Sequence, residues 1–267
     1  MATESWQLQV FKRSLKKKEK QRLLERNLDV VPTSINLDLG CAQGTLSYFL
    51  RQKGGCWLSA DMDFLNLQAT QTLLHRNLAQ LKEGPLPFKD QSFDLVASLD
   101  YLEHLEKDDF CLEEIHRVLK KNGRLILATP QTGRFFILHK LRSLMGLKLE
   151  FYGHKREGYS LETIQTKLEE AGFVVQSHKN FSRFFTEFLE LILNFFYIKF
   201  FRPNIPLGLR DGHIRPTSGE EFLNKKKTFR LYSILYPIVW IVSQIDKSLF
   251  FLKGYGLMIW AQRSEDN

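Results

Sequence analysis

The sequence predicts a doubly wound α/β fold, in which a mostly parallel sheet is covered by helices on both faces. Short apolar runs of strand length alternate with segments of helical periodicity between residues 35 and 177. This alternation is typical of parallel sheets built from strand–helix–strand units. A glycine-containing loop follows the first predicted strand, and an acidic residue, Asp61, follows the second. Both features are expected where such a sheet binds a ligand at the carboxyl ends of its strands.

The elements follow from the spacing of apolar residues and from the residues that end each run. Apolar runs predict strands at Ile35–Leu39, Cys56–Ala60, Phe93–Leu99, Arg124–Thr129, Phe173–Ser177 and Leu257–Gln262. Helical periodicity predicts helices at Trp6–Asn27, Leu46–Gln52, Phe64–Leu78, Asp109–Leu119, Leu161–Ala171 and Phe184–Phe201. Gly54, Gly123 and Gly172 end three of these helices, because glycine readily adopts the backbone conformation that closes a helix.

The composition bounds the class of protein. Hydrophobic residues make up 43% and charged residues 25% of the 267 residues, which excludes a largely disordered chain. The formal net charge is +8 and the chain has 22 phenylalanines, a combination that suggests an anionic lipid surface or a nucleic acid as partner. Three cysteines without a CxxC pair, and no long apolar run, favour a reduced cytoplasmic setting.

The loop after the first strand reads LDLGCAQG over residues 37–44. Glycines suit this position because the turn is tight and because a ligand must approach the backbone closely. The helix that follows offers free amide groups at its N-terminus. Asp61 lies 21 positions after Gly40, where a carboxylate can accept hydrogen bonds from ribose hydroxyls.

Four further motifs follow in order: LPFKDQSFD at 86–94, LEH at 102–104, RVLKKNGRL at 117–125 and ATP at 128–130. With the glycine loop and Asp61, the series resembles the class I S-adenosylmethionine-dependent methyltransferases, in particular the UbiE/UbiG-like methyltransferase domain. A nicotinamide-binding domain would instead carry GxGxxG after the first strand. The resemblance implies a seven-stranded, mostly parallel Rossmann-like sheet with helical insertions on the C-terminal side. It also implies S-adenosylmethionine as the cofactor.

The resemblance also implies which residues surround the cofactor. They are Asp38, Gly40, Cys41, Gly44, Asp61, Met62, Glu83, Leu86 and Leu99. Asp38, Gly40 and Gly44 would shape the pocket for the methionine part, while Asp61 would hold the ribose and Met62 would pack on the adenine. The chain departs from the family pattern at Lys82, where relatives often carry an acidic residue that meets the adenine amino group. Either Glu83 takes this role or backbone groups hold the adenine alone.

The candidate catalytic residues follow the strand Phe93–Leu99, because ligands bind at the carboxyl ends of strands in doubly wound sheets. The spacing Asp100-x-x-Glu103-His104 is similar to the Glu-x-x-Glu-His sequence of metal-assisted O-methyltransferases. Those enzymes act in ubiquinone biosynthesis or on the 3′ ends of small RNAs. By that resemblance the two carboxylates, His104 and the downstream His154 would bind a divalent cation such as Mg²⁺.

Two metal-free interpretations remain open. His104 or His154 could act as a general base, since imidazole titrates near neutrality. Alternatively, Glu103 and His104 only cap and pack the start of a helix. The other histidines, including His139, are interpreted as surface or packing residues. The chain lacks the Asn/Asp-Pro-Pro-aromatic sequence typical of enzymes that methylate base amino groups, which disfavours that reaction.

We divide the chain into a basic N-terminal helix (1–30), the S-adenosylmethionine-binding core (31–180), an aromatic-rich insertion (181–256) and the last core strand with its tail (257–267). The apolar residues of the insertion either pack on one another or form an acceptor lid or membrane contact. Lysine-rich segments, above all the first helix, supply positive charge for anionic headgroups.

The sequence therefore predicts O-methylation of a small hydrophobic or lipid-linked acceptor by a cytoplasmic protein that is peripheral at the inner face of a membrane. An RNA methyltransferase that uses the same basic surface is the alternative. Recognition of single-stranded RNA would require aromatics interleaved with basic residues, whereas here the aromatics cluster with aliphatics. A cofactor-binding scaffold without catalysis is a third class. The sequence does not determine the oligomeric state.

Overall fold

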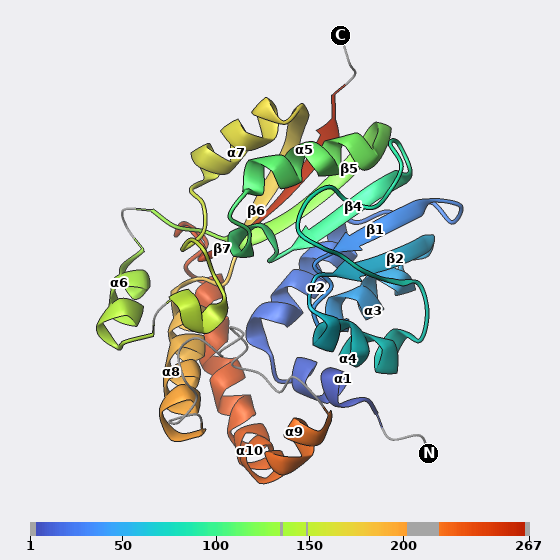
Figure 1. Cartoon of the computed structure of the whole chain (residues 1–267). Coiled ribbons are helices and arrows are strands. Elements are labelled where there is room, and N and C mark those ends of the chain that lie inside the picture. Colours follow the sequence, from blue (N-terminus) through green and yellow to red (C-terminus); the bar gives the residue numbers. More distant parts are fainter. Residues whose placement is uncertain (1–3, 134–135, 148, 202–218, 265–267) are drawn as a thin grey trace.

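The computed structural model describes residues 4–133, 136–147, 149–201 and 219–264, whose arrangement is shown in Figure 1. Seven strands form one sheet in the order β3-β2-β1-β4-β5-β7-β6. They are β1 (Ile35–Leu39), β2 (Cys56–Asp61), β3 (Leu78–Gln80), β4 (Phe93–Leu99), β5 (Leu119–Pro130), β6 (Phe173–Phe181) and β7 (Gly256–Arg263). Neighbouring strands are parallel, except that β7 runs antiparallel to both β5 and β6. The predicted mostly parallel, seven-stranded sheet is confirmed.

Helices cover both faces of the sheet and form a lobe beside it (Figure 1). They are α1 (Trp6–Phe11), α2 (Leu15–Asn27), α3 (Thr45–Gln52), α4 (Phe64–Leu74), α5 (Asp108–Val118), α6 (Ile137–Leu144), α7 (Leu161–Glu170), α8 (Phe184–Phe201), α9 (Gly219–Asn224) and α10 (Lys226–Ser243). Short 3-10 helices are η1 (Leu102–His104), η2 (Leu149–Tyr152) and η4 (Gln244–Lys247). The helices α5 and α7 cover one face, and α2 and α3 cover the other.

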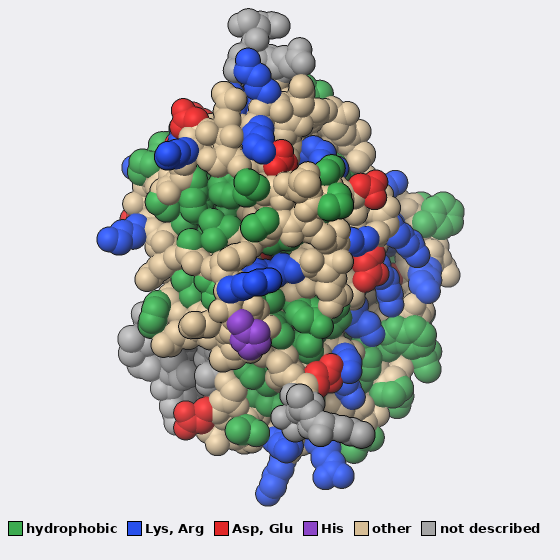
Figure 2. All heavy atoms as spheres, turned by 90° about the vertical axis from the view of Figure 1, so that its right-hand side faces the viewer, with side chains coloured by type: hydrophobic (Ala, Val, Ile, Leu, Met, Phe, Trp, Pro, Cys, Tyr) green, Lys and Arg blue, Asp and Glu red, His purple; other side chains and the backbone are tan. Residues whose placement is uncertain are grey.

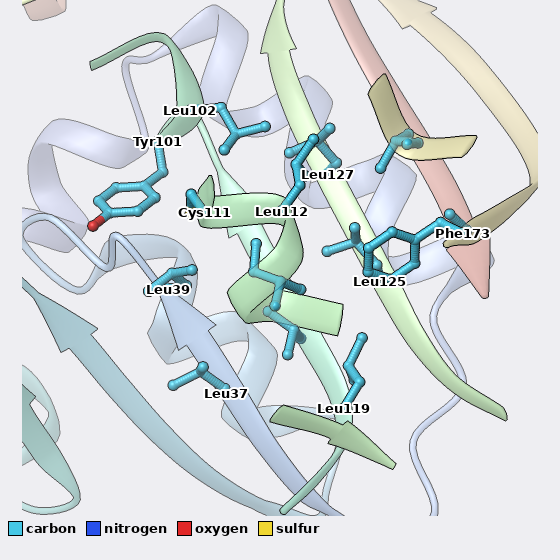
Figure 3. Packing of buried hydrophobic residues seen from close by; sticks show 14 of the residues in the cluster. Leu37, Leu39, Tyr101, Leu102, Cys111, Leu112, Leu119, Leu125, Leu127 and Phe173 are labelled. Carbon is cyan, nitrogen blue, oxygen red and sulfur yellow. The ribbon is translucent and has the colours of Figure 1, made fainter. Parts of the chain in front are cut away.

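Two apolar cores lie on opposite faces of the sheet, because side chains alternate along each strand. Leu37 and Leu39 of β1 pack with Leu112 of α5 in the larger cluster (Figure 3). Trp57 of β2 and Leu50 of α3 belong to the second cluster, and both are almost completely buried. Since both faces are buried, the central strands appear in the sequence as nearly continuous apolar runs.

The N-terminal region forms two helices, so the prediction of one helix over Trp6–Asn27 is wrong. Ser14 begins α2, because its hydroxyl accepts a hydrogen bond from the amide of Lys17. Serine is favoured at this position because it satisfies a free amide of the first turn. Leu24 of α2 packs in the second core cluster, so this helix lies against the sheet.

The edge strand β3 was not predicted from the sequence. The helix predicted over Phe64–Leu78 ends at Leu74, because His75 adopts a left-handed backbone conformation with φ of 65°. Residues Leu78–Gln80 then form the edge strand β3, which is too short to show an alternating pattern. The helix α6 likewise lies in a basic segment after Pro130 where no helix was predicted.

The segment between β6 and β7 forms the helical lobe. The helices α8 and α10 lie side by side and contact each other (Figure 1). A third apolar cluster joins Phe184 and Phe188 of α8 to Leu138 of α6 and to Tyr255. Internal packing therefore accounts for one part of the aromatic surplus of this segment.

Both ends of this lobe meet in the sheet, since Phe181 of β6 pairs with Gly256 of β7. The Pro-, Gly- and Arg-rich stretch at 202–218 and the tail at 265–267 lie outside the described residues. Among the helices that the structure describes, none combines the length and the apolar character needed to cross a membrane.

Candidate active site

A cavity of about 280 Å³ opens at the carboxyl ends of β1, β4 and β5, which is where doubly wound sheets bind ligands. The residues predicted from the sequence that line it are Asp38, Gly40, Cys41, Leu99, Asp100, Glu103, His104 and His154. The predicted cofactor residues outside this lining are Gly44, Asp61, Met62, Glu83 and Leu86. The cavity thus brings together the glycine loop and the candidate catalytic residues.

The loop after β1 depends on two glycines. Gly40 has a φ of 78°, and a Cβ atom at this position would lie 2.4 Å from Cδ2 of Tyr101. Gly44 has a φ of 76° and begins α3. The amide of Gly40 donates to the carbonyl oxygen of Ala60 at 2.8 Å, which ties the loop to β2. Glycine is therefore required at position 40 by the left-handed backbone and by the close packing of Tyr101 on the loop.

Asp38, near the end of β1, is almost completely buried. Burial raises the pKa of its carboxyl to about 6, although Ser47, Ser59 and Arg51 act in the opposite direction. Its Oδ2 atom is buried and has no hydrogen-bond partner among the described residues. Such an atom is costly in a folded protein, and a cationic amino group in the cavity would supply the missing partner.

Asp61, at the end of β2, is tied to the same loop. Its carboxylate accepts a hydrogen bond from the backbone amide of Ala42 at 2.7 Å and another from that of Asp63 at 2.9 Å. The side-chain amide of Asn66 lies 3.4 Å from the same carboxylate. These contacts fix the orientation of the carboxylate beside the glycine loop.

The remaining predicted cofactor residues have different surroundings. Cys41 and Leu99 are buried in the cavity wall, and burial raises the pKa of the Cys41 thiol, which therefore stays neutral. Met62 packs on the larger core cluster and Leu86 is buried within it, whereas Glu83 is exposed. Of the residues predicted for the methionine part, Asp38 and Gly40 therefore line the cavity, whereas Gly44 does not.

Glu103, His104 and His154 meet at the end of β4. Each offers one ligand atom, and these atoms all lie within 4.8 Å of one another. The two imidazole rings meet edge to face with centroids 4.8 Å apart, and Nδ1 of His104 lies 3.0 Å from the carbonyl oxygen of Gly153. The loop before α7 thus carries His154 to the carboxyl end of β4.

Asp100 lies apart from this group. Its carboxylate forms an ion pair with Lys20 of α2, and its backbone has a φ of 56°, which is uncommon outside glycine. Lys20 is buried, and its ammonium lies 5.4 Å from the centre of the Phe181 ring. Of the four residues predicted to bind a metal, three therefore lie together, while the fourth neutralises a buried lysine.

The protonation of this group suits proton transfer near neutral pH. Burial raises the pKa of the Glu103 carboxyl to about 7, while its own backbone amide and Lys20 act in the opposite direction. No other described residue hydrogen-bonds its carboxylate oxygens. Burial, His104 and Arg142 lower the pKa of His154 to about 3, so the ring is neutral at physiological pH.

Several residues that line the cavity were not predicted from the sequence as site residues. They are Lys16, Lys17, Lys20, His139, Arg142 and Tyr255. The lysines of α2 were interpreted as charges for headgroups, and His139 as a surface or packing residue; instead they line the cavity. The helical pattern shows that these lysines are polar, but it does not show whether a polar face meets solvent or a cavity.

Glu187 of α8 forms a buried ion cluster beside the cavity. It pairs with Lys16 of α2 and with Arg142 of α6, the latter at 2.6 Å. The hydroxyl of Ser182 donates to its other oxygen at 3.1 Å. The two cations hold the pKa of the Glu187 carboxyl below its usual range despite burial. The cluster joins three helices around the acceptor end of the cavity.

The strand order, the glycine loop after β1, the acid that ends β2 and the cavity at the strand ends define a class I S-adenosylmethionine-dependent methyltransferase. Residues 37–127 carry the domain of this family, since they match the family model described as "Methyltransferase domain". The family predicted from the sequence motifs is confirmed.

Proteins of known name and structure are similar to this core. The chain is 34% identical over 126 residues, 45% of its length, to a malonyl-[acyl-carrier protein] O-methyltransferase of Hamiltonella defensa. It is 29% identical over 97 residues, 35% of its length, to a ubiquinone biosynthesis O-methyltransferase of Pelagibacter ubique. These matches span 46% and 40% of those proteins, less than half of each. An S-adenosylmethionine-dependent methyltransferase of Archaeoglobus fulgidus shares the fold, with a TM-score of 0.56, 15% identity, and coverage of 92% of this chain and 93% of that chain.

Proposed function

We propose that this protein transfers a methyl group from S-adenosylmethionine to an oxygen atom of a hydrophobic or lipid-linked acceptor at a membrane surface. The observation that carries the proposal is the buried Glu103 carboxylate beside His104 and His154, in the same cavity as the glycine loop. These groups can accept the proton of an acceptor hydroxyl. The similarity to the two O-methyltransferases above supports transfer to oxygen.

The residues around the glycine loop fit S-adenosylmethionine. The unpartnered Oδ2 atom of Asp38 can accept a hydrogen bond from the methionine amino group. Gly40 and Gly44 give the loop its left-handed turns, with φ of 78° and 76°, and Asp61 is oriented to accept hydrogen bonds from ribose hydroxyls. When bound, S-adenosylmethionine supplies an electrophilic methyl group on its sulfonium centre.

The chain has three tasks in this reaction. Glu103 would take the proton of the acceptor hydroxyl, so that the oxygen could accept the methyl group that bound S-adenosylmethionine would supply. His104 and His154 border the same site, and the His104 imidazole can relay that proton to solvent. The cavity walls hold the acceptor oxygen in line with the methyl group and exclude water. The products are a methyl ether or ester and S-adenosylhomocysteine.

The acceptor end of the cavity favours a hydrophobic molecule. Tyr152, Phe181 and Tyr255 line it, together with Lys16, Arg142 and Glu187. The third apolar cluster lies directly behind this wall, since Tyr255 belongs to both. An aromatic wall that also carries charged side chains suits an acceptor with an apolar body and a polar group that orients it.

A metal-assisted version is the second candidate, because Glu103, His104 and His154 could ligate one divalent cation. The charges nearby argue against it. Arg142, Lys16 and Lys20 all lower the pKa of His154, so the local potential is positive. We therefore expect activity to be the same after dialysis against EDTA as after addition of Mg²⁺. Loss of activity in EDTA, with recovery in Mg²⁺, would assign a metal to these three residues instead.

An RNA substrate is the alternative for the positive charge. Figure 2 shows the side of the molecule that lies on the right in Figure 1, and there cationic, acidic and hydrophobic side chains are intermixed. A nucleic-acid surface typically shows a basic band with exposed aromatics along it, which this face does not show. In addition, Lys16 and Lys20 of α2 form ion pairs with Glu187 and Asp100 at the cavity.

Glu103→Gln is expected to lower kcat by about 100- to 10,000-fold, which is the usual contribution of a general base. The wild-type rate should rise as the pH increases through about 7, because the Glu103 carboxyl acts only when ionised. This rise should be absent from the variant. The measurement is kcat against pH. Glu106→Gln, which changes an exposed glutamate of the same segment, is the control and should retain the wild-type profile. An unchanged profile in Glu103→Gln would remove Glu103 as the base.

The acceptor class is tested with S-adenosylmethionine labelled in its methyl group. The protein is incubated with a total lipid extract, with a water-soluble metabolite extract or with RNA, and the labelled product is recovered. Label in the organic phase supports the proposal. Label in RNA alone supports the alternative substrate. Binding of S-adenosylhomocysteine without transfer to any extract would favour a cofactor-binding scaffold.

A further inference from the structure

The helix α10 presents an apolar face to the outside of the molecule. Ile234, Ile238 and Ile241 are 68%, 63% and 62% exposed, and their spacing places them on one side of the helix. Leu231 and Ile245 are exposed further along the same line. A continuous exposed apolar row of this length is uncommon on a soluble surface and marks an interaction site.

Two further aromatics follow η4 directly in the chain. Phe250 and Phe251 are 76% and 70% exposed, and their rings meet edge to face with centroids 5.8 Å apart. We call the following residues the apolar foot: Leu231, Ile234, Ile238, Ile241, Ile245, Phe250 and Phe251.

Contacts on the opposite side fix the orientation of α10. The hydroxyl of Tyr232 donates to the carbonyl oxygen of Arg13 at 2.9 Å, and Lys18 donates to the hydroxyl of Tyr236 at 3.3 Å. The helix also packs on α8, whose first amides donate to Asp246 just beyond α10. The apolar foot faces outward because the other side of the helix is already occupied.

Cationic side chains border the apolar foot at both ends of α10. Lys226, Lys227 and Arg230 are exposed at the start of the helix, and Lys247 is exposed just after its end. Asp246, the one acidic residue between positions 222 and 254, is buried against the start of α8. The charge around the foot is therefore positive.

We propose that the apolar foot is the surface by which this protein binds a bilayer that contains anionic lipid. The role of this surface rests on the proposed function. The exposed apolar row and the cations beside it do not depend on that function. An outward apolar row with lysine and arginine beside it matches a helix that lies in the membrane interface. Anionic headgroups complement these cations. A second copy of the chain would bring the same cations against each other, and like charges disfavour that contact.

The position of the foot also suits a lipid-linked acceptor. Glu190 and Asn194 of α8 line the cavity, and α10 packs on that same helix. A bilayer held against α10 would therefore lie beside the helix that forms one wall of the acceptor site.

The test is vesicle flotation with the whole chain. Vesicles of phosphatidylcholine with phosphatidylglycerol are compared with phosphatidylcholine alone, at about 0.1 M and about 0.5 M NaCl. The wild type is expected to float with the anionic vesicles at both concentrations, because apolar insertion survives screening. Ile234→Ser combined with Ile238→Ser is expected to lower vesicle affinity by about tenfold or more. Leu65→Ser combined with Val174→Ser removes exposed apolar side chains elsewhere and should leave flotation unchanged.

Calorimetric binding of S-adenosylhomocysteine shows that each variant is folded and separates this inference from the proposed function. A foot variant that binds S-adenosylhomocysteine but no longer floats supports the membrane surface. A wild type that fails to float, or a foot variant that floats equally well, overturns it. A wild-type dimer that is lost in the foot variant, without flotation, would assign the face to a second copy. Flotation by a wild type that neither binds S-adenosylhomocysteine nor transfers methyl groups would overturn only the proposed function.

Discussion

Asp61→Asn is expected to weaken the binding of S-adenosylhomocysteine by about 10- to 100-fold, the effect of losing one or two charge-assisted hydrogen bonds. The substitution preserves the size of the side chain and removes its negative charge. In the wild type the backbone amides of Ala42 and Asp63 orient the carboxylate at 2.7 and 2.9 Å. An amide in this position would lose the charge that strengthens hydrogen bonds from ribose hydroxyls. Its NH₂ group would also compete with these backbone donors for space.

Isothermal titration calorimetry with S-adenosylhomocysteine measures this effect. The matched control is Asp94→Asn. Asp94 lies at the start of β4, at the end of the strand away from the cavity. Its carboxylate pairs there with Lys120 at 2.8 Å and accepts a hydrogen bond from the backbone amide of Ile35. The control should bind with nearly the wild-type dissociation constant. Equal constants for the wild type and Asp61→Asn would remove Asp61 from the cofactor site. No heat of binding with the wild type would overturn the assignment of the cofactor.

Glu187→Ala is expected to lower the free energy of unfolding by about 3–5 kcal/mol, as is usual when one partner of a buried ion pair is removed. The variant leaves the Lys16 ammonium and the Arg142 guanidinium facing each other without the carboxylate between them. Ser182 also loses its acceptor. Because these groups join α2, α6 and α8, the loss should also loosen the acceptor end of the cavity.

Urea unfolding followed by circular dichroism measures the change, and its pH dependence tests the cause. The pKa of Glu187 in the folded protein lies below its usual value of 4.5. Its carboxylate therefore adds stability above the pKa of the unfolded chain, and this contribution is lost as the pH falls through the lower folded value. The difference between the wild type and Glu187→Ala should shrink below about pH 4.5. Glu106→Ala, which removes an exposed partner of Lys155, is the control and should unfold like the wild type. A similar stability of all three proteins would contradict the buried cluster.

The sheet could be predicted because each central strand is a recognisable apolar run in the sequence. Leu37 and Leu39 face one core while Trp57 and Leu95 face the other, and burial on both faces produces apolar runs that differ clearly from the helices between them. The edge strand β3 could not be predicted, since it is three residues long. The break before α2 was hidden because the lysine-rich pattern continues across Ser14.

The sequence predicted those site residues whose place in the fold follows from the strand that they come after. Glu103 and His104 follow β4 directly, so the carboxyl end of that strand places them at the cavity. The pairing of Lys20 with Asp100 depends instead on how α2 packs across the sheet, which residue spacing does not determine. The same holds for Glu187, whose two cationic partners come from separate helices. Asp100 therefore looked like a metal ligand in the sequence and is an ion-pair partner in the structure.

Because Phe181 pairs with Gly256, β6 and β7 are the two strands of a β-hairpin that is connected by residues 182–255. The helices α8, α9 and α10 of the helical lobe lie in this connection. Lengthening such a connection adds little to the free energy of closing it. The connection can therefore be exchanged as a cassette while the seven strands and the glycine loop keep their positions. Changes confined to this connection would therefore alter the side of the acceptor wall that carries Glu187, Glu190 and Asn194, and would leave the order of the seven strands unchanged.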